Sequence, residues 1–215
     1  MLRGVVVRSR TTGESGWSVS AGPAGRPARL PRRPGADDDP AQHQLAAHSR
    51  PRRLLVGGLG VGFSLVEAVA DPRLTAVDVV EVEPDLVAWH ASHLRRITGD
   101  ALVDPRVRVV VADLRDHLAA VATGEVARYD ALCLDVDNGP GWTVFEGNAE
   151  LYAAAGLERV LDAIEPGGVL AVWSAHESQP FEALLRDRLD DVRAETVDVH
   201  LDRGEPDVVY VARKP

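Results

Sequence analysis

The sequence predicts an α/β protein: a doubly wound, mostly parallel seven-stranded sheet that ends in an antiparallel hairpin. Three observations support this fold class. Five short apolar runs alternate with amphipathic segments, a glycine cluster follows the first run, and two alternating runs close the chain. The predicted strands are 54–56, 76–82, 107–112, 131–135 and 169–174, and the helices between them are 63–70, 85–96, 114–122 and 149–163.

The end of the chain departs from a purely parallel sheet. After a further predicted helix, 180–189, two alternating runs at 195–200 and 208–213 are joined by a short, turn-rich segment, 202–206. So short a connection requires antiparallel pairing. A parallel sheet with such a last pair distinguishes the class I methyltransferase-type fold from an ordinary Rossmann domain.

The N-terminal part is less regular. Short strands at 4–7 and 17–19 are expected to form a hairpin, 21–39 is rich in Gly, Pro and Arg, and Asp39 followed by Pro40 predicts a short helix to about His48. We therefore divide the chain into an arginine-rich leader and linker, 1–52, and an α/β domain, 53–215.

Charge is distributed unevenly along the chain. Residues 1–53 hold ten arginines and four acids, a local charge of +6, which leaves −15 for residues 54–215 of a chain with a net charge of −9. An acidic body does not favour nucleic acid as a partner. The one cysteine, Cys133, lies in an apolar run and is expected to be a core thiol. Without a membrane-spanning run or a signal-peptide core, the protein is expected in the cytoplasm, and a homodimer is kept as a hypothesis.

The glycine cluster after the first strand predicts a ligand site. Gly58, Gly60 and Gly62 form the pattern G-x-G-x-G, and Phe63 stands where the dinucleotide fingerprint G-x-G-x-x-G requires its third glycine. Bare backbone and the N-terminus of the following helix suit a nucleoside with polar or charged groups. The pattern fits an adenosine carrying a sulfonium better than a pyrophosphate, although close helix packing alone also explains glycines.

Acids follow the next two predicted strands. Glu81 lies 19 residues after Gly62, near the spacing at which an acid reaches a ribose, and is preferred over Glu83 on the same strand face. Asp113 can accept from an adenine amine, and the N–H of Leu114 can meet a ring nitrogen. The alternative role of Asp113 is helix N-cap, and both roles can hold together.

The fourth strand ends in a second polar group. Asp135, nearest the expected sulfonium, is predicted to steady or deprotonate an attacking amine. Asp137, Asn138 and Trp142 are predicted to bind the acceptor, with turn capping as the alternative for Asp137 or Asn138 and rim packing for Trp142.

Two histidines are weaker candidates for a functional site. His90 and His93 lie three apart on what is predicted to be a polar helix face. Neither has a carboxylate or cysteine at ligand spacing, so no metal site is predicted.

Taken together, these motifs resemble the spermidine synthase-like branch of the methyltransferase superfamily, the polyamine aminopropyltransferases. The resemblance covers about residues 53–173 and rests on LLVGGLGVG, VVEVEPDLV, DPRVRVVVADLRDHL, YDALCLDVDNGPG and LERVLDAIEPGGVLAVWSA. It implies S-adenosylmethionine or its decarboxylated form as co-substrate at the glycine loop. It also implies Glu81 on the ribose, Asp113 on the adenine and Asp135 on the attacking amine.

Two departures from the family's pattern concern selectivity. The family's glycine loop usually carries an aspartate where Gly60 stands, and its loss removes a charge that would select the decarboxylated ligand. The family's second acid after the fourth strand corresponds to Asn138, unless Asp137 serves.

The leading hypothesis is a transferase that passes an aminopropyl or methyl group from the sulfonium nucleoside to an amine-type nucleophile. The alternative is a non-catalytic nucleoside-binding protein of the same fold. A nicotinamide-dependent oxidoreductase is disfavoured because the third glycine is missing.

Overall fold

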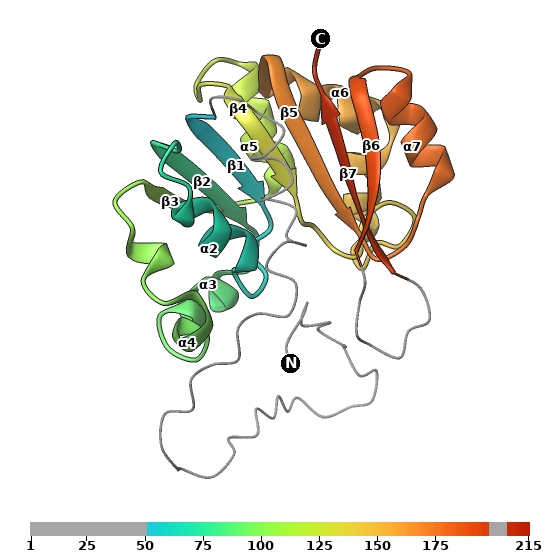
Figure 1. The fold of residues 1–215 in the computed structure, drawn as a ribbon. Helices are drawn as coiled ribbons and strands as arrows, with labels where there is room; N and C mark the ends of the chain where they lie inside the picture. Colours follow the sequence, from blue (N-terminus) through green and yellow to red (C-terminus); the bar gives the residue numbers. More distant parts are fainter. Residues whose placement is uncertain (1–50, 198–205) are drawn as a thin grey trace.

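The computed structural model describes residues 51–197 and 206–215 (Figure 1). Within them, seven strands form one sheet in the order β3-β2-β1-β4-β5-β7-β6, in which β1 to β5 are parallel and β7 is antiparallel to both neighbours. The strands are β1 (Arg53–Gly57), β2 (Ala76–Glu81), β3 (Val107–Val111), β4 (Tyr129–Leu134), β5 (Ile164–Ser174), β6 (Asp190–Val197) and β7 (Asp207–Arg213). The predicted fold class is confirmed.

Helices cover both faces of the sheet, as the apolar strands require. In Figure 1, α2, α3 and α4 lie in front of the β3-β2-β1 half, and α5 and α6 lie behind the sheet. The α-helices are α2 (Phe63–Ala70), α3 (Pro84–His90), α4 (Arg95–Thr98), α5 (Leu114–Ala122), α6 (Ala154–Asp162) and α7 (Gln179–Arg186), and the 3-10 helices are η2 (Ala101–Val103) and η3 (Glu146–Tyr152).

Several predicted boundaries were wrong. The helix expected over 85–96 is two helices, α3 and α4, and the helix expected over 149–163 begins as η3 before α6. Strand β5 starts at Ile164, five residues before the predicted run 169–174, because residues 164–168 already belong to it. Strand β6 starts at Asp190, five residues before the predicted run. The predicted N-terminal hairpin and the helix near 40–48 lie outside the described residues.

The core has one large cluster on each face of the sheet. Leu55, Leu132 and Leu170 from the strands pack with α5, α6 and α7 on one face. Leu54 and Cys133 pack with α2 on the other, so Cys133 is the buried core thiol that was expected. Because successive residues of a strand point to opposite faces, the central residues of β1, β4 and β5 are apolar on both faces of the sheet.

A polar cluster centred on the buried carboxylate of Asp78, the Asp78 cluster, lies on the same face of the sheet as the first of these cores. It consists of Asp78 of β2, Arg108 of β3, His117 of α5 and Tyr129 of β4, and Arg53 stacks over the Tyr129 ring at 5.2 Å. Asp78 accepts two hydrogen bonds of 2.8 Å from Arg108 and one of 2.6 Å from the Tyr129 hydroxyl. Burial opposes ionisation of Asp78, but these donors outweigh it and lower the pKa of the carboxyl.

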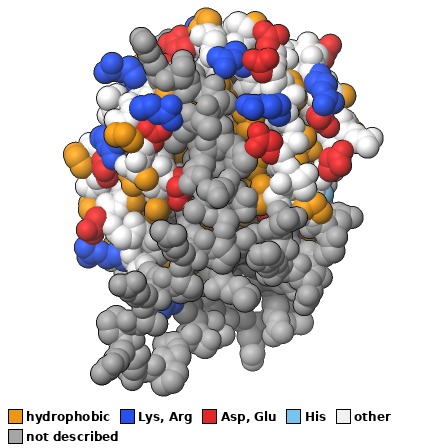
Figure 2. All heavy atoms as spheres, viewed as in Figure 1, with side chains coloured by type: hydrophobic (Ala, Val, Ile, Leu, Met, Phe, Trp, Pro, Cys, Tyr) orange, Lys and Arg blue, Asp and Glu red, His pale blue; other side chains and the backbone are white. Residues whose placement is uncertain are grey.

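Charged side chains of both signs are interspersed over the upper part of the face seen in Figure 2. Some of these charges form ion pairs. Arg213 of β7 pairs with Asp191 of β6 at 3.3 Å, and Arg186 pairs with Glu182 within α7 at 2.5 Å. Among the residues that the structure describes, no helix is long and apolar enough to cross a membrane.

Candidate nucleoside and acceptor site

The glycine turn, residues 58–62, joins β1 to α2 and contains three glycines with positive φ: Gly58 at 93°, Gly60 at 49° and Gly62 at 85°. A Cβ on Gly58 would collide with the backbone carbonyl of Asp135, and one on Gly62 would collide with Thr98. Gly60 differs, because no atom of the described residues lies within 4 Å of its Cβ position. Among the described residues, therefore, nothing covers its bare face.

Some backbone N–H groups of the turn donate hydrogen bonds within the protein, and others have no acceptor among the described residues. The N–H of Gly58 donates to Val80 O at 2.9 Å, and the N–H of Gly62 donates to Leu59 O at 2.8 Å. Within residues 51–197 and 206–215, the N–H groups of Gly60 and Val61 have no hydrogen-bond partner. These two donors, next to the positive end of the α2 dipole, can meet an acceptor of the ligand.

Glu81 lies directly beside the turn. It is 8% exposed, and its Oε2 and Oε1 accept from the N–H groups of Leu59 and Glu83, both at 2.9 Å. Glu83 is exposed and serves as N-cap of α3, with its side chain accepting from the Asp85 N–H at 3.3 Å. Of the two acids, Glu81 is the one at the turn, and its carboxylate holds the turn through the Leu59 N–H. The ribose contact stays a prediction.

His90 was predicted wrongly. Instead of facing solvent with His93, it is 2% exposed, and its Nε2 lies 2.9 Å from the carbonyl oxygen of Gly60. Burial lowers the pKa of His90, against smaller opposing effects of Gly60 and Glu81. The sequence holds a signal for this burial: His90 follows Val87 by three residues, and Val87 packs against the core beneath α2 and α3.

Asp113 takes the N-cap position of α5, which was its alternative role. Its Oδ1 accepts from the N–H of Arg115 at 2.8 Å, and its carboxylate forms an ion pair with the Arg115 guanidinium at 2.5 Å. Those bonds hold the pKa of Asp113 below its usual value. Within the described part of the chain, the Leu114 N–H has no partner. Adenine binding by Asp113 and Leu114 stays a prediction.

Asp135 stands at the end of β4, against the turn. Its N–H donates to Gly57 O at 2.8 Å, and its Oδ2 accepts from the Ser64 hydroxyl of α2 at 3.0 Å. The carboxylate is only partly buried. It is therefore held by the elements that form the glycine turn and keeps part of its surface exposed, and its contact with an attacking amine stays a prediction.

Asp137 anchors the loop after β4. Its φ is 55°, and its Oδ2 accepts from the N–H groups of Val144 and Phe145 at 3.1 and 3.4 Å and from Asn148 Nδ2 at 3.0 Å. The capping alternative therefore holds for Asp137. The backbone carbonyl of Asn138 accepts from Ala175 N at 3.0 Å, which ties the same loop to the end of β5.

Trp142 belongs to an apolar rim of this loop. Its ring stacks on His176 with centroids 5.2 Å apart and an angle of 12°, and it is 46% exposed. Val144 and Phe145 are more exposed still. Trp142 therefore packs at the rim and keeps an exposed surface, and its contact with the acceptor stays a prediction.

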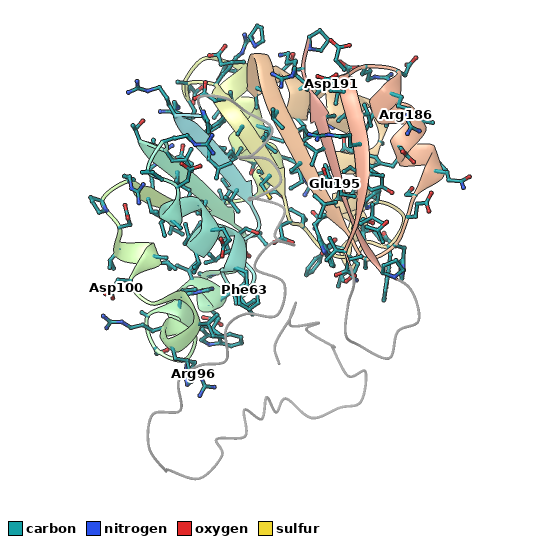
Figure 3. The ribbon with its side chains drawn as sticks, viewed as in Figure 1. Phe63, Arg96, Asp100, Arg186, Asp191 and Glu195 are labelled. Atoms are coloured by element: carbon teal, nitrogen blue, oxygen red, sulfur yellow. The ribbon has the colours of Figure 1, made fainter. Side chains whose placement is uncertain are left out.

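The predicted site residues gather at one edge of the sheet, because the carboxyl ends of parallel strands meet there. In Figure 3, Phe63, the first residue of α2, lies at this lower edge, whereas Asp191 lies at the opposite edge. Among the described residues, no group of three or more metal-ligating side chains is found.

Strand order, the antiparallel seventh strand and the glycine turn define a class I methyltransferase-type fold. Solved structures agree. Spermidine synthase from Thermotoga maritima superposes with a TM-score of 0.64 at 16% identity, over 80% of this chain and 57% of that chain. Human methyltransferase-like protein 13 in complex with SAH gives 0.61 at 22% identity, over 80% of this chain and 79% of that chain.

Sequence comparison identifies the family. Residues 41–185 match the family model of the spermine/spermidine synthase domain, and the chain belongs to this family. Polyamine aminopropyltransferase 2 of Pseudomonas aeruginosa is 29% identical over 67% of this chain and 41% of its own length. Putrescine N-methyltransferase 3 of Nicotiana tabacum is 30% identical over 59% of this chain and 31% of its own length. The chain thus spans less than half the length of these relatives.

Proposed function

We propose that this chain is a transferase that binds S-adenosylmethionine or its decarboxylated form at the glycine turn and transfers an alkyl group to an amine. The observation that carries the proposal is the open face of Gly60, flanked by unpartnered N–H groups within the described residues and by the carboxylates of Glu81 and Asp135. Family membership supports it, because the relatives bear the names of aminopropyltransferases and of putrescine N-methyltransferases.

The proposed reaction is an in-line displacement. The amine nitrogen bonds to the carbon attached to the sulfonium, the carbon–sulfur bond breaks, and its electron pair stays on sulfur. The surplus proton of the amine passes to Asp135 or to water. Alignment is the main contribution of the protein, and Asp135 adds charge stabilisation and a proton acceptor.

The transferred group depends on the ligand's amino acid part. Gly60 provides no carboxylate to repel that of S-adenosylmethionine, which supports methyl transfer, and the aminopropyltransferase relatives support aminopropyl transfer. Asp137 accepts hydrogen bonds from its own loop, so of the two aspartates after β4 we expect Asp135 to be the one that meets a diamine.

Calorimetry with S-adenosylmethionine, its decarboxylated analogue and methylthioadenosine tests the proposal. We expect all three to bind, and a mass spectrum of a putrescine reaction should show which group is transferred. No heat with any of the three would contradict the proposed site. Comparable affinities for the carboxylated and decarboxylated ligands would argue against conventional polyamine synthesis.

A further inference from the structure

His90 contacts the glycine turn from the side of the protein interior. Its Nε2 lies 2.9 Å from the Gly60 carbonyl oxygen, which can only accept a hydrogen bond, so Nε2 carries the proton. The buried Nδ1 has no hydrogen-bond partner among the described residues. A neutral ring with its proton on Nε2 satisfies both conditions, because an unprotonated Nδ1 brings no unpaired donor.

The hydrogen bond to Gly60 also orients a donor. The Gly60–Val61 peptide is trans, and in a trans peptide the C=O and N–H groups point in opposite directions. A carbonyl held toward His90 therefore turns the Val61 N–H away from the interior. That N–H is one of the two donors of the turn without a partner in the described part of the chain.

Gly62 makes room for this arrangement. A Cβ on Gly62 would lie 2.9 Å from Cε1 of His90 and would also collide with Thr98 of α4. The ring is thus enclosed by the turn, by α4 and by the helix that carries it. Glu81 of β2 is the charged group that acts on it from a neighbouring strand.

We propose that His90 is a positioning residue for nucleoside binding: its Nε2–H holds the Gly60 carbonyl so that the Val61 N–H faces the ligand. The inference rests on the proposed function, since it assumes that the nucleoside lies on the glycine turn. It assigns a role to a residue that neither the glycine pattern nor the acids after the strands pointed to.

Substitutions at His90 separate its donor from its bulk. Calorimetry with S-adenosylmethionine is expected to show a loss of about three- to tenfold in affinity for His90→Leu, the range for one neutral hydrogen bond. His90→Gln should stay within about twofold of wild type, because its amide nitrogen can replace Nε2. His93→Leu, the same change at an exposed position three residues away, is the matched control and should leave affinity unchanged.

Nuclear magnetic resonance gives a readout that a merely structural residue would not move. In wild type, S-adenosylmethionine should shift the Val61 amide signal, and in His90→Leu this shift should be smaller or broadened. Equal affinity and an equal Val61 shift in a folded His90→Leu protein would overturn the inference, as would a folded His90→Gln protein that loses as much affinity as His90→Leu.

The outcomes distinguish the two proposals. If wild type binds none of the three nucleosides, the proposed function fails first. If wild type binds but the His90 variants behave as the control does, only the role of His90 fails. If His90→Leu does not fold, the wild-type protein provides the test. The exchange of the His90 Nε2–H proton with water should slow when S-adenosylmethionine is added. An unchanged exchange rate would refute the role of His90.

Discussion

Two carboxylates of the same strand, Asp78 and Glu81, are both buried, yet their surroundings differ. Asp78 meets the guanidinium of Arg108 and the hydroxyl of Tyr129, so its charge is balanced inside the fold. Glu81 accepts from two backbone N–H groups, which carry no net charge. The comparison teaches that the charge of Asp78 is balanced by a cation of the fold, whereas Glu81 has no ion pair among the described residues, which is what the proposed cationic ligand would require.

The largest expected effect lies at the carboxyl edge. Asp135→Asn keeps the shape of the side chain and removes its charge and its capacity to take a proton. We expect turnover to fall by about 10²- to 10⁴-fold, with nucleoside affinity nearly unchanged. Rate measurements with putrescine and calorimetry with S-adenosylmethionine check the two halves of this expectation. Undiminished turnover would show that Asp135 does not act on the acceptor, and a wild type that binds without turnover would favour the non-catalytic alternative.

The next effect concerns the Asp78 cluster. Asp78→Asn leaves Arg108 and the Tyr129 hydroxyl without their carboxylate, and we expect the free energy of unfolding to fall by about 2–3 kcal/mol, reduced from the fully buried case because Arg108 is half exposed. Urea unfolding measures this loss. Asp100→Asn breaks an ion pair in which both side chains are exposed and is the control, expected to be neutral. If Asp78→Asn lost nucleoside affinity but no stability, the Asp78 cluster would have to be counted as part of the binding site.

Gly60→Asp should adjust selectivity rather than stability. The position has a φ of 49°, which aspartate tolerates better than most residues, and its Cβ would meet no atom of the described residues within 4 Å. We expect the affinity ratio of decarboxylated to carboxylated ligand to rise by about tenfold, through repulsion of the carboxylate. Gly60→Asn has the same shape without the charge. If it produces the same change, charge is not the selector.

The smallest effect is a pH dependence of stability. Burial lowers the pKa of both His90 and His117, so the folded state prefers their neutral forms. Below pH 6.5 or so, which is about the pKa of histidine in the unfolded chain, the unfolded chain binds protons that the folded chain does not. The free energy of unfolding therefore decreases as the pH falls from this value to the pKa of the folded state. We expect the free energy of unfolding to fall as the pH is lowered from 7 to 5, with His117 and His90 both contributing. Urea unfolding at several pH values in this range measures the effect. The free energy of unfolding should depend less steeply on pH in His117→Gln than in wild type.

Periodicity and turn chemistry predicted the regular parts of the fold. Helices α2 and α5 have the predicted bounds, because an apolar stripe after a glycine turn or an aspartate N-cap fixes both ends. The break between α3 and α4 was missed, since the charged and polar residues that follow His90 continue a helical pattern without a breaker. α3 ends at His90, the residue that contacts the Gly60 carbonyl, and no local pattern encodes this tertiary contact.

Site residues were predictable where strand ends and acids coincide. Glu81 is the last residue of β2, Asp113 and Asp135 follow β3 and β4, and all three lie at one edge, as the topology requires. Their hydrogen-bond partners were less predictable. That Asp137 would bond to residues 144–148 depends on how a loop of eleven residues returns on itself, and only the tolerance of aspartate for positive φ hints at it.

Gly58 has one more consequence. Its α-carbon lies so close to the main chain of Asp135 that even a methyl group would not fit, and the N–H of Asp135 bonds to Gly57. The distance between the glycine turn and Asp135, the proposed proton acceptor, is therefore set by main-chain atoms in direct contact. Exchanging side chains of the loop at 141–146 to accommodate other amines should thus leave the line of attack intact.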